Sequence, residues 1–370
     1  MRRLALLSLS VILLVAVLAS AAMAQSGRLK PEPTPPPDET PVRIETEEIK
    51  VNILAYDEEG NFVTNVAEDD IVITEDDILH QATSVRRLPA SVLIVMDTGG
   101  ELRSQKTLDQ TRSAAMALVA ALRPEDQVAV LQYADKAEIV GEWTTDRAAA
   151  MAAIRRAKFG RRSDLIGALR LGREVLMAEG VDNRHMVLIS DGTDSMANSL
   201  ERRNAFRELL QTDISVHVLS YTRMEIVDIE PRTKRLSNQP PPKAMPDEVA
   251  AQLPNGVRDI ATAPKIGPTI NMDRKHLETM RERKADLESA ELQFLDITAN
   301  TNGTIIIPLD GEEMTQKAAT IAQMIDGAYV LTYTPKIAFS EKQGERTITV
   351  TSKRPGLIIE AKRKLLVPAR

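Results

Sequence analysis

Hydrophobic positions follow two different periods along this chain. In residues 43–88 and again in residues 328–368, apolar and polar residues alternate, as in "IKVNILAYD" and "ERTITVTS". Such alternation is typical of strands with one buried face. In residues 90–327, continuous apolar runs such as "SVLIVM" are separated by stretches whose apolar residues recur every three or four positions. This second pattern predicts buried strands that alternate with helices.

The two patterns together predict the fold class. Strands alternating with helices favour an α/β fold with a doubly wound, mostly parallel sheet and right-handed crossovers. The alternating segments at either end of the chain are each too short to form a stable β domain alone. We therefore predict that N-terminal and C-terminal strands pack together as a smaller β-sandwich-like domain, with the α/β domain inserted between them.

The start of the chain has the pattern of a secretory signal. Two arginines precede a long apolar run, and "AMA" stands directly before Gln25. This pattern predicts export with cleavage after Ala24. An uncleaved anchor helix is the alternative, because the apolar run is almost long enough to span a bilayer. Residues 25–42 are rich in proline, which predicts a semi-rigid spacer. A periplasmic, an extracellular and an anchored location all stay open.

Residues 223–284 interrupt the α/β rhythm and hold eight of the chain's 20 prolines. A connection of this length is either functional or a surface loop, so a partner-contacting arm and a plain loop both stay open. The predicted organisation is a signal peptide at 1–24, a linker at 25–42, a β module at 43–88, an α/β domain at 90–327 with an insertion at 223–284, and C-terminal strands at 328–368.

Composition narrows the function classes. The chain is 43% hydrophobic and 27% charged, which is ordinary for a globular protein. A formal net charge of -6 argues against nucleic acid as a partner, because a phosphate-binding surface needs an excess of basic residues. The chain has no cysteine, which excludes disulfides, thiolate metal sites and thiol nucleophiles.

No catalytic motif stands out, so the sequence predicts a protein that is not an enzyme. We find no phosphate-binding glycine loop, no zinc-ligand spacing and no motif that supports a Ser-His-Asp triad. "DTG" at residues 97–99 resembles the catalytic tripeptide of aspartic proteases. That chemistry needs two such loops in a β-rich setting, whereas this one precedes a predicted helix.

Polar residues gather where the predicted strands end. Asp97 follows the run "SVLIVM", Asp191 follows the run "HMVLIS", and Ser163 precedes a predicted helix. The carboxyl ends of parallel strands meet at one edge of a sheet, where ligands bind. Carboxylate and hydroxyl oxygens are the ligands that a hard cation such as Mg²⁺ prefers.

At these residues the chain resembles a von Willebrand factor type A domain. The phrases "VLIVMDTGG", "RRSDLIGAL" and "HMVLISDGTDS" stand in the family's order, and "YVLTYTP" and "KRPGLIIEAKR" resemble a group of bacterial secreted proteins related to it. The family binds a divalent cation at a metal-ion-dependent adhesion site with an Asp-x-Ser-x-Ser loop. The resemblance implies that Asp97 matches the first aspartate, Ser163 a threonine and Asp191 the last aspartate.

The chain departs from that motif at its two serines, which are replaced by Gly99 and Glu101. Glu101 would add a third carboxylate to those of Asp97 and Asp191, and this third acid would neutralise a bound cation. Without a cation, the three acids would repel one another. Arg161 and Arg162 directly precede Ser163 and could pair the carboxylates instead. Two readings stay open: an arginine-paired cleft without metal, and a degenerate site for Mg²⁺ or another divalent cation with the ligands Asp97, Glu101, Ser163 and Asp191.

The resemblance implies an exported protein–protein interaction or adhesion-type module that uses this edge of the sheet. The alternative is a structural subunit of a cell-envelope assembly whose cleft is inert and metal-free. We expect an unidentified protein as the partner, no nucleic acid, and contact with a membrane only through an uncleaved signal segment.

Overall fold

The computed structural model describes most of the chain after residue 46. The predicted signal peptide and linker lie outside the described residues. Among the described helices, none combines the length and the apolar character that crossing a bilayer requires. The described residues are 47–100, 105–234, 236–237, 245–254, 257–263, 269–270, 273–359 and 361–368.

The central sheet is mostly parallel, as predicted. Within the described residues its strand order is β12-β9-β8-β5-β6-β7, and only the edge strand β7 runs antiparallel to its neighbour. Every residue of β5 is buried, which explains why its sequence is a continuous apolar run. The strands are β5 (Ser91–Asp97), β6 (Gln127–Tyr133), β7 (Ala137–Thr144), β8 (Arg184–Ser190), β9 (Ser215–Ser220) and β12 (Ile305–Ile306).

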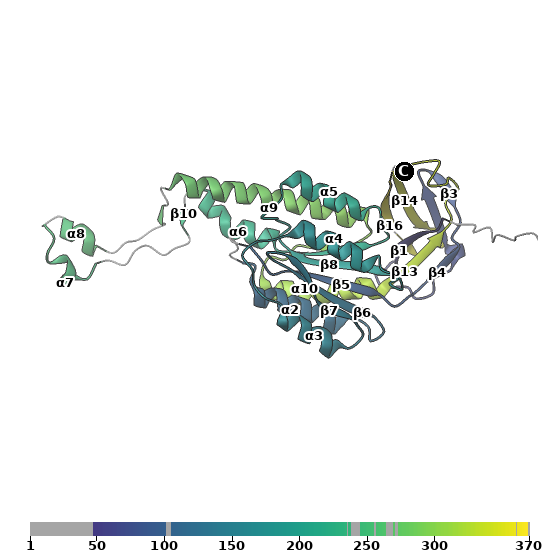
Figure 1. The fold of residues 1–370 in the computed structure, drawn as a ribbon, viewed down its shortest axis with the longest axis horizontal. Coiled ribbons are helices and arrows are strands. Elements are labelled where there is room, and N and C mark those ends of the chain that lie inside the picture. The colour runs from purple at the N-terminus through teal and green to yellow at the C-terminus, as the bar shows by residue number, and fades with distance from the viewer. Residues whose placement is uncertain are drawn as a thin grey trace, which may run out of the picture. The chain divides into compact units, whose positions relative to one another are not determined.

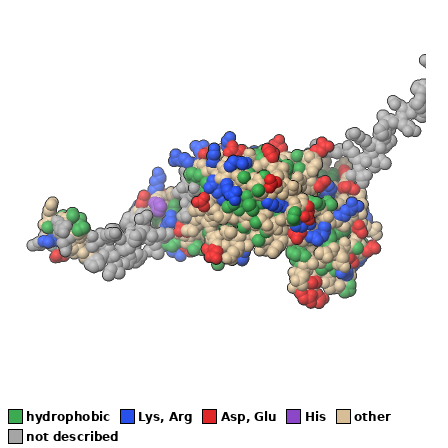
Figure 2. All heavy atoms as spheres, turned by 90° about the horizontal axis from the view of Figure 1, so that it is seen from below, with side chains coloured by type: hydrophobic (Ala, Val, Ile, Leu, Met, Phe, Trp, Pro, Cys, Tyr) green, Lys and Arg blue, Asp and Glu red, His purple; other side chains and the backbone are tan. Residues whose placement is uncertain are grey.

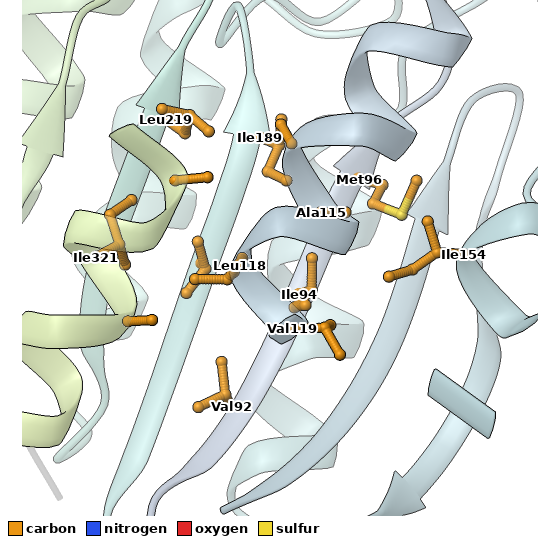
Figure 3. Close-up of a cluster of buried hydrophobic side chains, with 14 of the residues drawn as sticks. Val92, Ile94, Met96, Ala115, Leu118, Val119, Ile154, Ile189, Leu219 and Ile321 are labelled. Atoms are coloured by element: carbon orange, nitrogen blue, oxygen red, sulfur yellow. The ribbon is translucent and has the colours of Figure 1, made fainter. Parts of the chain in front are cut away.

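Helices cover both faces of this sheet (Figure 1). Alternate residues of β5 point to opposite faces. Ile94 packs with the cluster of α2, α3 and α10, drawn in Figure 3, and Leu93 packs with the cluster of α4, α5 and α9. The helices are α2 (Leu108–Ala121), α3 (Arg147–Arg156), α4 (Leu165–Leu176), α5 (Ser199–Leu209), α9 (Arg274–Asn300) and α10 (Gly311–Gly327).

Strands from the two ends of the chain form a β-sandwich-like unit. β1 pairs with β13 in one sheet and β2 pairs with β14 in the other, so the predicted fold class is confirmed. Apolar residues of both sheets share one core, which includes Ile53, Ile73 and Leu331. The two sheets are β15-β1-β13-β4 and β16-β14-β2-β3. Their strands are β1 (Ile49–Tyr56), β2 (Ile71–Glu75), β3 (Ile78–His80), β4 (Ser84–Arg86), β13 (Ala328–Tyr333), β14 (Gly344–Ser352), β15 (Ile358–Ile359) and β16 (Ala361–Val367).

The predicted insertion contributes regular structure to the α/β domain. Its first part is α6 (Thr222–Thr233), and α9 begins inside it at Arg274. Ile226 and Ile229 of α6 pack against Met280 and Leu287 of α9. This contact fixes the beginning of α9 beside the carboxyl end of the sheet. The predicted domain limits themselves stay predictions. The remaining described elements here are β10 (Leu236–Ser237), α7 (Asp247–Ala250), α8 (Val257–Thr262) and β11 (Thr269–Ile270).

Acidic and basic side chains both occur across the face drawn in Figure 2. That face is therefore not a uniformly basic surface of the kind that nucleic acid requires.

Candidate functional site

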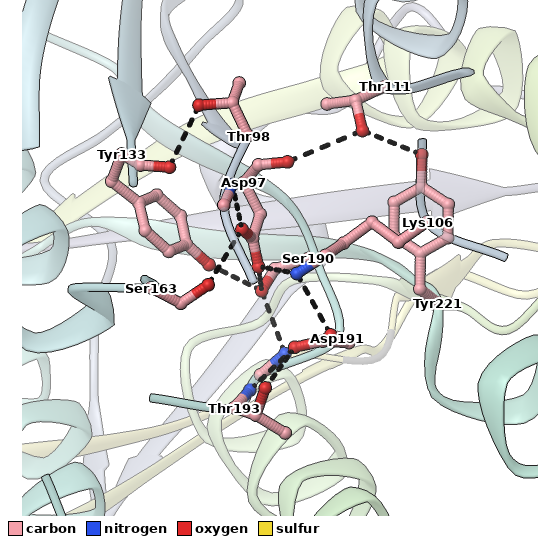
Figure 4. A network of polar contacts seen from close by, with 12 residues as sticks. Asp97, Thr98, Lys106, Thr111, Tyr133, Ser163, Ser190, Asp191, Thr193 and Tyr221 are labelled. Atoms are coloured by element: carbon pink, nitrogen blue, oxygen red, sulfur yellow. Dashed lines mark hydrogen bonds and ion pairs between the residues drawn. The ribbon is translucent and has the colours of Figure 1, made fainter. Parts of the chain in front are cut away.

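Three of the predicted site residues meet at the carboxyl edge of the sheet (Figure 4). Asp97 ends β5, Asp191 follows β8, and Ser163 precedes α4. The Ser163 hydroxyl donates a hydrogen bond to Asp97 Oδ1 over 3.2 Å. The neighbouring Asp164 caps α4 by accepting from the Gly167 amide, which leaves Ser163 available for this contact. Glu101, the fourth predicted ligand, lies outside the described residues.

Both carboxylates are sealed from solvent. Asp97 and Asp191 are 0% exposed and Ser163 is 1% exposed. Asp97 Oδ1 also accepts from the Gly99 amide at 3.1 Å, and Oδ2 accepts from the Ser190 hydroxyl at 3.1 Å. These contacts fix the orientation of the Asp97 carboxylate from several sides.

The ammonium group of Lys106 lies between the two carboxylates. Its Nζ is 2.7 Å from Asp97 Oδ2 and 3.0 Å from Asp191 Oδ2, and the side chain is 1% exposed. Glu225 of α6 holds the preceding backbone, because its Oε1 accepts from the amides of Gln105 at 2.7 Å and Lys106 at 2.8 Å. A cation shared by the two aspartates is thus supplied by the chain itself.

A second internal cation comes from α9. Arg283 Nη2 donates to Asp191 Oδ2 over 2.8 Å, and Nη1 donates to Thr193 Oγ1 over 2.7 Å. Thr193 in turn donates from its hydroxyl and its amide to Asp191 Oδ1, at 2.7 and 2.9 Å. Asp191 is therefore enclosed by Lys106, Arg283 and the Thr193 turn.

The buried carboxylates of Asp97 and Asp191 are matched by two cations, Lys106 and Arg283. Burial alone would raise the pKa of Asp191, but Lys106 and Arg283 hold that pKa well below its usual range. Burial raises the pKa of Asp97, and the charge of Lys106 offsets part of that rise. The directions differ because Asp191 faces two cations, whereas Asp97 faces one cation and the negative charge of Asp191. Burial opposes the charged form of Lys106, yet the two carboxylates raise its pKa.

The described residues do not fit a divalent cation. The Lys106 ammonium occupies the space between the carboxylates, and two positive charges at that point would repel. A side chain at Gly99 would overlap the backbone oxygen of Arg162, so the serine of the family motif has no room here. Within the described part of the chain, no group of three or more His, Cys, Asp or Glu side chains could hold a metal ion.

The two arginines considered from the sequence lie elsewhere. Arg161 and Arg162 are exposed, and the Arg162 amide donates to Asp135 Oδ1 over 3.1 Å. Among the described residues, the ion pairs to Asp97 and Asp191 come instead from Lys106 and Arg283. The sequence analysis missed both cations. The signal for Lys106 is a lysine placed just before the helix that follows the Asp97 loop.

A hollow of about 280 Å³ lies over this cluster. Arg283 forms part of its wall, and its other lining residues come from the Asp97 loop, the loop after β8 and α9. They are Gly100, Thr193, Asp194, Ser195, Thr279, Glu282 and Asp286. Asp194 holds its own loop by accepting from the amides of Met196 and Ala197, and it ties that loop to α4 by accepting from the amide of Ile166.

Comparison with protein families identifies the α/β domain. Residues 92–194 match the family model described as the von Willebrand factor type A domain. Residues 92–194 of this chain are therefore similar to a von Willebrand factor type A domain. The resemblance inferred from the sequence is thereby confirmed. The matched part of the type A domain includes Asp97, Lys106, Ser163 and Asp191, whereas Arg283 comes from outside it.

Several solved structures are similar to this chain. BatB from Bacteroides thetaiotaomicron is 16% identical, with a TM-score of 0.36 over 64% of this chain and 98% of that chain. A von Willebrand factor type A protein from Catenulispora acidiphila is 11% identical, with a TM-score of 0.39 over 87% of this chain and 74% of that chain. Manganese-loaded TRAP from Plasmodium vivax is 10% identical, with a TM-score of 0.37 over 85% of this chain and 97% of that chain. No curated protein matches the chain.

Proposed function

We propose that this protein is a metal-independent, non-enzymatic interaction module of adhesion type, which meets a protein partner at the carboxyl edge of its sheet. Type A domains are typically interaction modules rather than enzymes. The observation that carries the metal-independent part is the Lys106 ammonium, 2.7 Å from Asp97 and 3.0 Å from Asp191. It supplies the charge that the family takes from a cation.

The buried lysine changes how a partner could be held. A bound cation with an open coordination position can accept a carboxylate from a partner. Lys106 is tethered and 1% exposed, so a partner's carboxylate cannot reach it. Contact at this edge would therefore involve the rim of the hollow, where Glu282 and Asp286 of α9 are exposed.

We further propose that the protein is exported, like the bacterial secreted group that its flanking sequences resemble. The support is the signal-like start of the chain. Whether the mature protein stays in the periplasm, leaves the cell or is anchored is a separate question. Fractionation of cells that express the tagged chain would answer it.

Metal independence is tested by calorimetric titration of the protein with Mg²⁺ and with Mn²⁺. We expect no saturable heat. The matched control is Asp97→Asn, which keeps the shape of the side chain and removes its charge. A saturable heat in the parent protein that disappears in Asp97→Asn would overturn the proposal.

The use of the carboxyl edge is tested by site-specific photo-cross-linking in an envelope extract. A photoreactive residue replaces Glu282 at the carboxyl edge or, as the control, exposed Glu125 just before β6 at the opposite edge. We expect a discrete adduct only from position 282, unchanged by a chelator. An adduct that a chelator abolishes, or one from position 125 alone, would contradict the proposal.

A second candidate is a structural subunit whose strand-tip cleft is inert. The complete burial of Asp97 and Asp191, both 0% exposed, favours this candidate. The two candidates differ in the effect of Glu282→Lys, a charge reversal at an exposed position, when the photoreactive residue is placed at Thr279, which also lines the hollow. An interaction module loses the adduct with an unchanged melting temperature, whereas a structural subunit retains its contacts through other surfaces.

A further inference from the structure

A groove between α5 and α9 lies open on the surface of the type A domain. It has a volume of about 330 Å³, and its apolar lining is Phe206, Leu210, Leu292 and Ile297. Leu292 is 68% exposed, and Leu200, on α5, is 56% exposed. A leucine this exposed within an apolar groove, as Leu292 is, is typical of a surface that another protein covers.

The two walls of the groove carry opposite charges. On α5, Arg203 and Arg207 lie one turn apart, line the groove and are exposed. Within the described residues, neither has an ion-pair partner. On α9, Asp296 lines the groove and is exposed, and Glu288, which is exposed two turns earlier and lies 3.6 Å from Lys284, adds a second carboxylate. The surface is therefore an apolar stripe with a basic edge and an acidic edge.

A polar atom inside the groove also lacks a partner. The side-chain oxygen of Gln293 is buried and accepts no hydrogen bond from the described residues, while its amide nitrogen donates weakly to Ser289 Oγ over 3.4 Å. A buried acceptor without a donor is costly. An occupant of the groove that brings a donor would remove this cost.

We propose that a second copy of this chain occupies the groove, with a two-fold axis that runs along the stripe. Rotation about such an axis lays the α5 edge of each copy on the α9 edge of the other, so that basic residues face acidic residues on both sides at once. A two-fold axis across the stripe would instead lay like charges together. A surface of this kind is self-complementary, as an isologous interface must be. This inference does not depend on the function proposed for the carboxyl edge.

The chain has no cysteine, which allows a direct test by cross-linking the full chain. Gln293→Cys places one thiol in the lining of the groove, and a dimer whose axis runs along the groove brings two such thiols within reach of a short cross-linker. The control is Leu309→Cys, at a residue that is 70% exposed and lies outside the groove. A short bis-maleimide should give a covalent dimer with Gln293→Cys and not with Leu309→Cys. Equal yields from the two variants would overturn the proposal.

Charge reversal then tests the direction of the axis. In the Gln293→Cys background, one variant carries Arg203→Glu with Arg207→Glu, and the other carries Glu288→Lys with Asp296→Lys. Each alone places like charges on both edges, and we expect its dimer yield to fall about tenfold. Mixed together, the two variants have complementary edges on both sides, so a heterodimer should form at the parental yield.

Mixing also controls for misfolding. A heterodimer identified by two tags of different size requires both variants to be folded. Variants that cross-link alone as well as the parent does would contradict the charge pairing. Failure of the mixture to cross-link, with far-ultraviolet circular dichroism spectra that match the parent, would contradict the second copy as the occupant.

Discussion

The two ends of the central strands satisfy their buried polar groups in different ways. At the carboxyl ends, Asp97 and Asp191 are paired with Lys106 and Arg283. At the amino ends of β8 and β9, two buried histidines have pKa values below the usual range. One end is a charged cluster that depends on keeping its cations. The other end holds a neutral cluster of two histidines, whose hydrogen bonds require that neither ring gains a proton.

The neutral cluster is a chain of hydrogen bonds in which each group donates to the next. The Thr304 amide donates to His217 Nδ1 over 3.2 Å, so that nitrogen carries no proton. His217 Nε2 must then donate to His185 Nδ1 over 3.0 Å, and His185 Nε2 donates to Asn183 Oδ1 over 3.0 Å. Both rings are neutral in this arrangement. Burial opposes the charged form of both rings and lowers both pKa values, that of His217 to about 4.

The largest expected effect comes from removing the cation of the charged cluster. Lys106→Met keeps most of the side-chain volume and leaves two buried carboxylates with Arg283 alone. Breaking a buried ion pair in this way costs about 3–5 kcal/mol. Urea unfolding measures it, and Lys136→Met, at a lysine whose side chain is 75% exposed, is the control. If the two variants are equally stable, the charged cluster does not hold this end of the sheet together.

Acid should destabilise the neutral cluster next most strongly. In the unfolded chain histidine takes up a proton below about pH 6.5, whereas His217 in the folded protein does so only near pH 4. The stability that this difference provides is present above pH 6.5 and is lost as the pH falls toward 4. The loss attributable to His217 is about 3 kcal/mol. His217→Gln should flatten this part of the stability–pH curve, and an unchanged curve would rule out the depressed pKa.

A smaller effect is expected from restoring the family's serine beside Asp97. Gly99→Ser places a side chain against the backbone of Arg162, so the loop must shift. Overpacking of this kind costs about 1–3 kcal/mol. The variant should therefore melt at a lower temperature and still give no saturable heat with Mn²⁺. Manganese binding by Gly99→Ser would show that the serine alone was missing from a working cation site.

The smallest effect is expected from the two arginines that the sequence singled out. Arg161→Ala with Arg162→Ala removes exposed side chains that make no ion pair with Asp97 or Asp191 in the described structure. Substitutions at such positions change stability by about 0.5 kcal/mol or less. A loss comparable to that of Lys106→Met would mean that these arginines do neutralise the aspartates.

The sequence was sufficient to predict the sheet and the meeting of three polar residues at its edge. The run "SVLIVM" ends at Asp97 and "HMVLIS" ends before Asp191, and parallel strands bring such ends together whatever their side chains are. The type A resemblance then placed Ser163 beside them. These predictions follow from the order of the strands along the chain, which local sequence patterns indicate well.

The cations could not be predicted in the same way. A lysine just before a helix, like Lys106, is usually solvated. Arg283 stands 92 positions after Asp191, among Arg281, Glu282 and Lys284, where a charged run is typical of an exposed helix face. The direction in which the Arg283 side chain points depends on how Met280 and Leu287 pack against α6. That packing is a tertiary contact, and no local period in the sequence reports it.

The length of α9 has a mechanical consequence. Arg283 neutralises Asp191 near one end, and Thr301, which ends the helix, forms a β-bridge with Arg363 of β16. The two residues are 18 positions apart on one rod, a span of about 27 Å. A force on β16 that moves α9 along its axis would also move the Arg283 guanidinium away from the Asp191 carboxylate. Helix α9 thus couples the β-sandwich-like unit mechanically to the carboxyl edge of the central sheet.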